Sequence, residues 1–377
     1  MPTIEEILRA AKEAGASDVH LTVGIPPKMR VNGNLITMDY PRMLPADTLE
    51  VLVNIMTEVQ RERFEERGEY DMSFSIPNCG RYRVNAYKQR GSVALAFRLV
   101  GTVVPSPEEL GVPESVVELY QRKRGLVLVT GPTGSGKSTT LYTALNELNS
   151  DMVNIVTVED PVEANVDGVN QVQVNPKANL TFGNALRSIL RQDPDIIMIG
   201  EIRDRETASI AVQASITGHL VVSTLHTNDT ASSVTRLLDM GVESYLIADA
   251  LTGIIAQRLV RRLCPNCKRR HVLLEHKLEY LGLTPEEKDS AEVYEPVGCQ
   301  RCAGTGYFDR IGIYEIMEIT PRMRTMISHR CDTGTLRETA IAEGMHTLRE
   351  SARRLVLEGT TSISEMADEM AAMMTNR

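Results

Sequence analysis

The chain has 377 residues, a formal net charge of -9 at pH 7, 42% hydrophobic residues and 24% charged residues. This length predicts two or three domains, and the composition is typical of folded soluble proteins. The acidic total argues against a protein whose main task is to grip nucleic acid, because such a protein is usually basic over the gripping domain.

The sequence also lacks the usual signs of membrane insertion. No stretch approaches the roughly 18 apolar residues of a membrane span. The opening Met1-Pro2-Thr3-Ile4-Glu5-Glu6 is acidic, whereas a signal peptide starts with basic residues. We therefore expect a cytoplasmic protein without a transmembrane segment.

Residues 1–100 are predicted to form a small α+β domain of the PAS-like type. An amphipathic helix with Ile4, Ile7, Leu8 and Ala11 on one face opens it. The expected strands cover residues 18–23, 28–31, 70–76, 81–89 and 93–99, with a second helix around 49–59. A linker rich in proline and glycine follows at residues 101–113.

Four arginines cluster on the last two strands of this domain and on their connection: Arg81, Arg83, Arg90 and Arg98. They are compatible with an ordinary solvated strand face. Alternatively, their permanently charged guanidinium groups reach the phosphates of a nucleotide that another domain or subunit binds. Arg81 and Arg83 should share one face of their strand, because side chains alternate along a strand.

A phosphate-binding loop follows the linker. Gly131-Pro132-Thr133-Gly134-Ser135-Gly136-Lys137-Ser138 fits G-x-x-x-x-G-K-[ST], in which backbone N–H groups surround phosphates and the lysine reaches the β and γ oxygens. An apolar strand precedes the loop and a helix follows it, as the motif requires. The predicted nucleotide-binding residues are Gly131, Thr133, Gly134, Ser135, Gly136, Lys137, Ser138 and Thr139.

Residues 114–262 alternate short apolar strands with amphipathic helices, a pattern that predicts a mostly parallel sheet in a RecA-like α/β domain. The candidate strands are Leu126–Val129, Asn154–Val158, Ile196–Ile199 and Leu220–Ser223. The second runs into Glu159-Asp160-Pro161-Val162-Glu163, and acids so close to phosphate suggest handling of Mg2+ or water. The third ends at Glu201, a typical position for a carboxylate that holds Mg2+.

Two histidines, His219 and His226, flank the fourth strand. A lone histidine is most often structural. A pair around one strand of a nucleotide-binding sheet could instead sense the γ-phosphate or contact a neighbouring subunit.

Two Cys-x-x-Cys pairs in residues 263–310 predict a structural zinc site formed by Cys264, Cys267, Cys299 and Cys302. Unligated thiols are the alternative, and four cysteine ligands would leave no open position for catalysis. The segment 271–293 between the pairs is helical in pattern. A strand at 311–319 and helices up to residue 377 should follow, and Met366, Met370, Met373 and Met374 form a stripe on the last helix. Such a stripe is typical of core packing, although it also suits a partner surface.

Four long motifs in fixed order resemble the secretion ATPase superfamily, the hexameric motors of type IV pili and type II secretion, commonly written PilT, PilB and GspE. They are the phosphate loop, residues 159–163, the stretch from Arg191 to Asp204, and the stretch from Thr217 to Thr227. The resemblance covers almost the whole chain.

The resemblance implies a role for each candidate site residue. Lys137 and Ser138 would bind phosphate and Mg2+, Glu163 would polarise the attacking water, and Glu201 would be the Walker B acid that holds Mg2+. His219 and His226 would form the histidine box, while Arg81 and Arg98 would complete a site between domains. A homohexamer that hydrolyses ATP with Mg2+ and acts on an inner-membrane platform protein is then expected, peripherally associated with that membrane.

Subtype signals point in two directions. The four cysteines and Arg310-Ile311-Gly312-Ile313-Tyr314-Glu315 resemble assembly and export motors, whereas the approach to the phosphate loop, Arg124 to Thr130, resembles retraction motors. The direction of work stays open. The competing hypotheses are a nucleic-acid translocase on the same fold, which the acidic total disfavours, and a non-hydrolysing nucleotide-gated scaffold, which the presence of both Glu163 and Glu201 disfavours.

Overall fold

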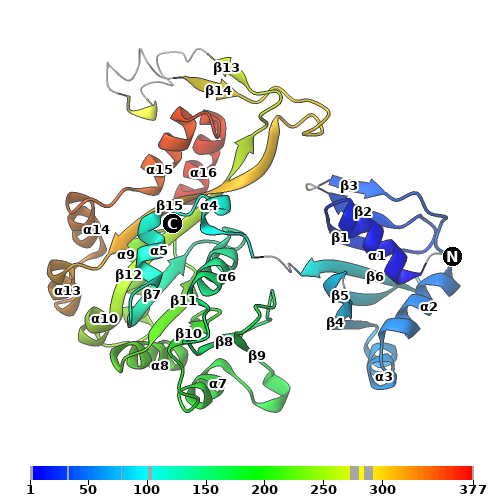
Figure 1. The fold of residues 1–377 in the computed structure, drawn as a ribbon, viewed down its shortest axis with the longest axis horizontal. Helices are drawn as coiled ribbons and strands as arrows, with labels where there is room; N and C mark the ends of the chain where they lie inside the picture. Colours follow the sequence, from blue (N-terminus) through cyan, green and yellow to red (C-terminus); the bar gives the residue numbers. More distant parts are fainter. Residues whose placement is uncertain are drawn as a thin grey trace. The chain divides into compact units, whose positions relative to one another are not determined.

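The computed structural model describes residues 3–31, 34–77, 79–100, 104–271, 280–283 and 292–375. The chain forms two compact units (Figure 1). The first unit comprises Met1–Val103 with Glu163–Asn165, and the second comprises Val104–Val162 with Val166–Arg377. The segments predicted as a tetracysteine element and a C-terminal extension therefore fall in the same unit as the phosphate loop.

The first unit is built on a six-stranded antiparallel sheet with the strand order β3-β2-β1-β6-β5-β4. The strands are β1 Ala16–Leu21, β2 Lys28–Val31, β3 Asn34–Thr37, β4 Glu69–Ile76, β5 Gly80–Gln89 and β6 Ser92–Val100. The helices are α1 Ile4–Glu13, α2 Pro45–Ile55 and α3 Glu58–Arg67. Buried side chains of α1 and α2, such as Leu8 and Leu52, share one core with the inner face of the sheet.

Strand alternation fixes which residues of β5 face this core. Tyr82, Val84 and Ala86 are buried, while Arg81 and Arg83 lie on the outer face, as predicted. Two details differ from the prediction. The second helix is a pair, α2 and α3, interrupted at Met56, and the short exposed strand β3 was not predicted. The PAS-like assignment stays a prediction.

The second unit has a seven-stranded sheet with the order β15-β12-β7-β11-β10-β8-β9. All neighbouring strands are parallel except β12 and β15, which pair antiparallel. The strands are β7 Gly125–Thr130, β8 Ile155–Glu159, β9 Asn170–Gln173, β10 Ile196–Ile199, β11 Leu220–Leu225, β12 Leu251–Leu263 and β15 Tyr307–Glu318. All four predicted strands of this domain are confirmed, and β9 and β12 are additional.

Helices cover both faces of this sheet (Figure 1), as a parallel sheet buried on both faces requires. Residues of α7 Phe182–Ile189, α8 Arg205–Ile216, α9 Thr230–Asp239 and α10 Ser244–Ala250 pack in one core, joined by α13 Pro321–Ser328 and α14 Thr333–Ala342. On the other face, α5 Glu114–Tyr120 and α6 Lys137–Leu148 pack in a second core. The predicted linker contains a short helix, α4 Pro107–Leu110, and η1 Pro176–Ala178 is a single 3-10 turn.

The C-terminal helices pack against the two longest strands of this sheet, β12 and β15. α15 Leu348–Leu357 and α16 Ile363–Thr375 share a core with Val260 of β12 and Ile313 of β15. Two short strands, β13 Arg269–His271 and β14 Val293–Glu295, pair antiparallel. The predicted helical segment 271–293 lies mostly outside the described residues. No helix in the described ranges is long and apolar enough to cross a bilayer.

Candidate functional site

The phosphate loop joins the carboxyl end of β7 to the first turn of α6. Glycine conformations shape it: Gly134 and Gly136 have φ values of 82° and 86°, in the left-handed region that favours glycine. The Lys137 ammonium is folded into the loop, where it donates hydrogen bonds to the carbonyl oxygens of Gly131 (2.7 Å) and Pro132 (2.9 Å). Ser135 Oγ is buried with no hydrogen-bond partner among the described residues. A loop with this shape and an orphaned donor fits a phosphate group.

Gln257 packs against the phosphate loop. It is buried on β12, and its side-chain oxygen accepts a hydrogen bond from Thr140 of α6 at 2.8 Å. A Cβ atom at Gly131 would lie 2.5 Å from the Gln257 carbonyl oxygen, and one at Gly136 would lie 2.8 Å from Gln257 Nε2. Gln257 was not among the predicted site residues, because β12 itself was not predicted.

The ends of neighbouring strands bring Glu201 and His226 together at the same sheet edge. Glu201 follows β10 and His226 follows β11, and their side chains approach to 3.6 Å. Arg203 also forms an ion pair with Glu201, at 2.5 Å. Partial burial lowers the pKa of His226, and the positive charge of nearby Lys137 lowers it further, although Glu201 acts in the opposite sense. A carboxylate, an imidazole and the loop lysine thus share one electrostatic environment.

His219 lies at the other end of β11. It precedes Leu220, and its Nδ1 contacts the carbonyl oxygen of Ala214 at 2.9 Å. It is seven positions before His226, which corresponds to about 23 Å along the strand. Within one chain, the two predicted histidines therefore do not share a site.

The acids of residues 159–163 differ in environment. Glu159, the last residue of β8, is only 3% exposed, whereas Asp160 and Glu163 are exposed. The peptide bond between Asp160 and Pro161 is cis. Glu163 is grouped with the first unit rather than with the phosphate loop.

The predicted arginines of the first unit lie on β5 and β6. Arg83 is directly opposite Arg98 in the sheet register, so Arg81, Arg83 and Arg98 share its outer face. Arg98 donates a hydrogen bond to Asp18 at 2.8 Å, and Arg83 forms an ion pair with Asp71 at 3.7 Å. Arg90 lies instead in the turn between the two strands.

The four cysteines of the two Cys-x-x-Cys pairs come together as predicted. Their sulfur atoms all lie within 4.8 Å of one another, and the pairs Cys264–Cys299 and Cys267–Cys302 are each separated by 3.8 Å. A tetrahedral ion with Zn–S bonds of about 2.3 Å requires sulfur separations of about 3.8 Å. The arrangement therefore fits a four-coordinate zinc ion. Cys79 is buried and Cys331 half-buried, both as free thiols.

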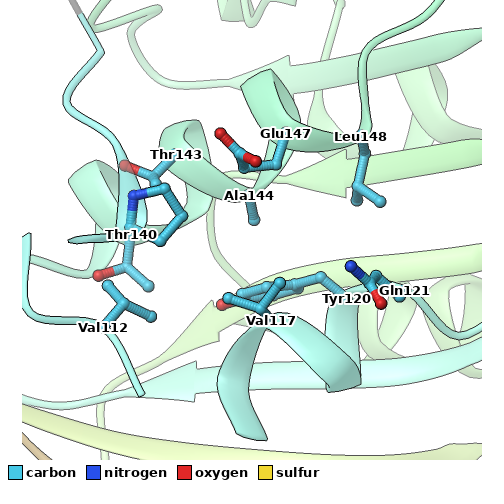
Figure 2. Close-up of a pocket in the computed structure, with 10 residues that line it drawn as sticks. Val112, Val117, Tyr120, Gln121, Thr140, Thr143, Ala144, Glu147 and Leu148 are labelled. Atoms are coloured by element: carbon cyan, nitrogen blue, oxygen red, sulfur yellow. The ribbon is translucent and has the colours of Figure 1, made fainter. Parts of the chain in front are cut away.

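A small cavity of about 60 Å³ lies between α5 and α6. Figure 2 shows Thr140, Thr143, Ala144 and Glu147 along its α6 side, with Tyr120 facing them. The Tyr120 hydroxyl is buried and forms no hydrogen bond with any described residue, and burial raises its pKa strongly.

Comparison with known proteins gives consistent matches. A model of the family described as "Type II/IV secretion system protein" matches residues 1–368. The chain is 42% identical to the type IV pilus assembly ATPase PilB of Acinetobacter baylyi, over 96% of this chain and 65% of that protein. It is 40% identical to type II secretion system protein E of Dickeya dadantii, over 96% of this chain and 74% of that protein.

Solved structures agree with these relatives. The crystal structure of the pilus retraction motor PilT with bound ADP matches with a TM-score of 0.79 at 33% identity, covering 98% of this chain and 97% of that one. The chain spans 65% of the length of the first PilB relative.

Proposed function

Because the chain belongs to the type II/IV secretion system protein family, we propose that it is an ATP-hydrolysing motor of a type IV pilus or a type II secretion system. The observation that carries this proposal is the sheet edge at which a complete phosphate loop, Glu201 and His226 meet. Nucleotides bind at this edge of open α/β sheets, outside the carboxyl ends of the strands.

The residues of this edge then have distinct roles. The loop backbone from Gly131 to Gly136 holds the phosphates and Lys137 neutralises them, with Ser138 and Thr139 at the first turn of the helix. Ser138 and Glu201 hold Mg2+, which when bound withdraws charge from the phosphate oxygens. His226 contacts Glu201 and senses the charge of the bound nucleotide.

The remaining roles belong to residues outside this edge. Glu163 accepts the proton of the attacking water. Arg81 and Arg98 deliver positive charge to the phosphates from a small domain, so that the transition state is stabilised only in a closed form of the protein. His219, at the far end of β11, meets a nucleotide only if another copy of the chain supplies it. This requirement favours a ring, and we propose a homohexamer.

The tetracysteine cluster has a structural role in this proposal. Its four thiolates hold Zn2+ in a closed coordination shell, which braces the segment between β12 and β15 and takes no part in hydrolysis. Metal analysis of the native protein should find about one zinc per chain. A content far below that would contradict this role.

The motor acts on a platform protein at the inner membrane in this account, and the small PAS-like domain moves against the nucleotide domain during the cycle. The chain is 42% identical to an assembly ATPase and 40% identical to a type II secretion protein, whereas it is 33% identical to the retraction motor PilT. We therefore favour pilus assembly or secretion as its direction of work.

The test compares wild type with Glu163→Gln in steady-state ATP hydrolysis with Mg2+, with and without DNA. We expect turnover in the wild type and a loss of about 100-fold or more in the variant, with nucleotide binding retained. Equal activity of the two proteins would overturn the role of Glu163. Turnover that depends on DNA would instead indicate a nucleic-acid translocase.

A further inference from the structure

Glu159 is a buried carboxylate that the proposed mechanism does not use. It ends β8, directly before the turn formed by residues 160–162 that leads to Glu163, and it is only 3% exposed. Such burial separates it from the water and metal ions that its neighbours in the sequence could bind. Its contacts nevertheless connect it both to the phosphate-binding helix α6 and to the strand end that carries Glu201.

Three uncharged side chains hold this carboxylate in place. Tyr142 donates its hydroxyl hydrogen bond to Oε2. Thr157 and Gln171 donate to Oε1, with distances of 2.5 Å and 3.1 Å. A buried carboxylate without sufficient donors is costly, so these bonds define one orientation of the Glu159 side chain.

The Tyr142 bond links Glu159 to the phosphate loop. Tyr142 lies on α6, five residues after Lys137, which corresponds to about 7.5 Å along the helix that starts at the loop. Tyr142 is itself only 4% exposed. The bond therefore joins two buried and ordered elements, the phosphate-binding helix and the end of β8.

The backbone of Glu159 contacts the strand end that carries Glu201. A Cβ atom on Gly200 would lie 3.4 Å from the Glu159 Cα, and the Gly200 N–H donates to the Val158 carbonyl oxygen at 2.8 Å. The Glu159 carbonyl oxygen also accepts a hydrogen bond from Val174, at 2.8 Å. Glu159 thus lies between the phosphate-binding helix and the end of β10, which precedes Glu201.

We infer that Tyr142 is a positioning residue for hydrolysis: through its hydrogen bond to the buried Glu159, it sets residues 160–162, which lead to Glu163, at a fixed spacing from the phosphate loop. The inference rests on the proposed function and deepens it. Tyr142 does not touch the phosphates, so its loss should leave nucleotide binding in place. A displacement of about 1 Å in a catalytic group can cost about 100-fold in rate.

The test is Tyr142→Phe, which removes one buried hydroxyl and nothing else. We expect kcat for ATP to fall about tenfold or more, while KM and the dissociation constant of a fluorescent ADP analogue stay within about threefold of wild type. A purely structural role would lower the thermal midpoint without this separation of kcat from nucleotide affinity.

Tyr120→Phe is the matched control. It removes the same atom from another buried tyrosine, on α5, whose hydroxyl has no hydrogen-bond partner among the described residues. We expect its kcat and KM to equal those of wild type. The double variant Tyr142→Phe/Glu159→Gln should have about the kcat of the more damaged single variant, because the two residues act through one bond.

The outcomes separate the inference from the proposed function. A wild type without ATP turnover overturns the proposed function and this inference with it. An active wild type combined with a Tyr142→Phe kcat within about twofold of it, or with fully additive losses in the double variant, overturns the inference alone. Should Tyr142→Phe fail to fold, Gln171→Leu removes a donor to the other carboxylate oxygen and should separate kcat from affinity in the same way.

Discussion

Gly131 shows how closely the phosphate loop is packed against β12. Its missing side chain leaves room for the Gln257 carbonyl oxygen, which cannot move without disturbing the sheet. We expect Gly131→Ala to lower the free energy of unfolding by about 1–3 kcal/mol in urea titrations. Gly134→Ala is the control for backbone strain, because both glycines have a positive φ but a Cβ atom at Gly134 would meet nothing within 4 Å. A larger loss in the control would contradict the packing argument.

Glu315 on β15 is a second buried carboxylate, and it forms an ion pair with Arg337. It is fully buried and accepts hydrogen bonds from Thr230 and Arg337, with Arg337 Nη2 at 3.0 Å. Removing Glu315 leaves both donors of the buried Thr230 without their acceptor, whereas Arg337 keeps Asp229 as an ion-pair partner at 3.9 Å. We therefore expect Glu315→Ala to cost about 1–3 kcal/mol of unfolding free energy.

The control for that variant lies on the same strand. Glu318 pairs with Arg122, and both side chains are about half exposed. Glu318→Ala should change the unfolding free energy by about 0–1 kcal/mol. Similar losses for the two variants would show that the burial of Glu315 does not set its contribution.

The sequence predicted single residues well where chemistry demands a fixed spacing. The phosphate loop and the two Cys-x-x-Cys pairs could be located because only a few residue types, at fixed spacings, can bind phosphate or zinc. Gln257 and the bond between Tyr142 and Glu159 could not, since Gln257 and Tyr142 belong to no motif and the motif at residues 159–163 does not show which side chain Glu159 contacts. Their partners are distant in sequence and meet only in the folded sheet.

The helices and strands also divide into those that the sequence predicted and those that it did not. Strands β7, β8, β10 and β11 were predicted because each is a short apolar run next to a turn. β12 was missed because it is buried along most of its length, with no alternation, and carries Arg258, Arg261 and Arg262.

Burial explains the methionine stripe of α16: Met366 is fully buried and Met370 is nearly so, in the core beside β12 and β15. The methionines of the stripe whose side chains the structure describes therefore pack in the core. The side chain of Met374 is not among those described.

The pairing of β1 with β6 gives the first unit a predictable response to acid. Partial burial would by itself raise the pKa of Asp18, but hydrogen bonds from Arg98 and Ser17 and the charge of Arg98 lower it below its ordinary value of 3.8. A carboxyl whose pKa is depressed in the folded state stabilises the fold above pH 3.8, and this contribution is lost as the pH falls through the lowered pKa.

Arg98→Ala should therefore destabilise the protein at pH 6, by at most about 1 kcal/mol because the Arg98 side chain is 73% exposed. The difference from wild type should shrink as the pH falls below 3.8 and Asp18 becomes protonated, first in the variant and then, through the lowered pKa, in the wild type. Unfolding in urea at several pH values measures it. A difference that stays constant across this range would contradict the role of the Asp18 charge.

At the level of the chain, the family and the two-unit organisation account for most of what the sequence implied. The phosphate loop pointed to a nucleotide-dependent protein, the acidic composition argued against a nucleic-acid-binding one, and the family match agrees with the motif resemblance. The separation of His219 from His226 could have been predicted, because a six-residue strand between two residues keeps them at its opposite ends.

The central claim is that the phosphate loop binds and hydrolyses ATP, and the most direct measurement is the turnover of MgATP by wild type beside Lys137→Ala. Lys137 is 8% exposed and lies inside the loop, so its removal should abolish both hydrolysis and tight binding of nucleotide while the protein stays folded. The account predicts a saturable wild-type rate and no rate above background in the variant. A wild type without turnover, or a variant that hydrolyses ATP at the wild-type rate, would contradict it.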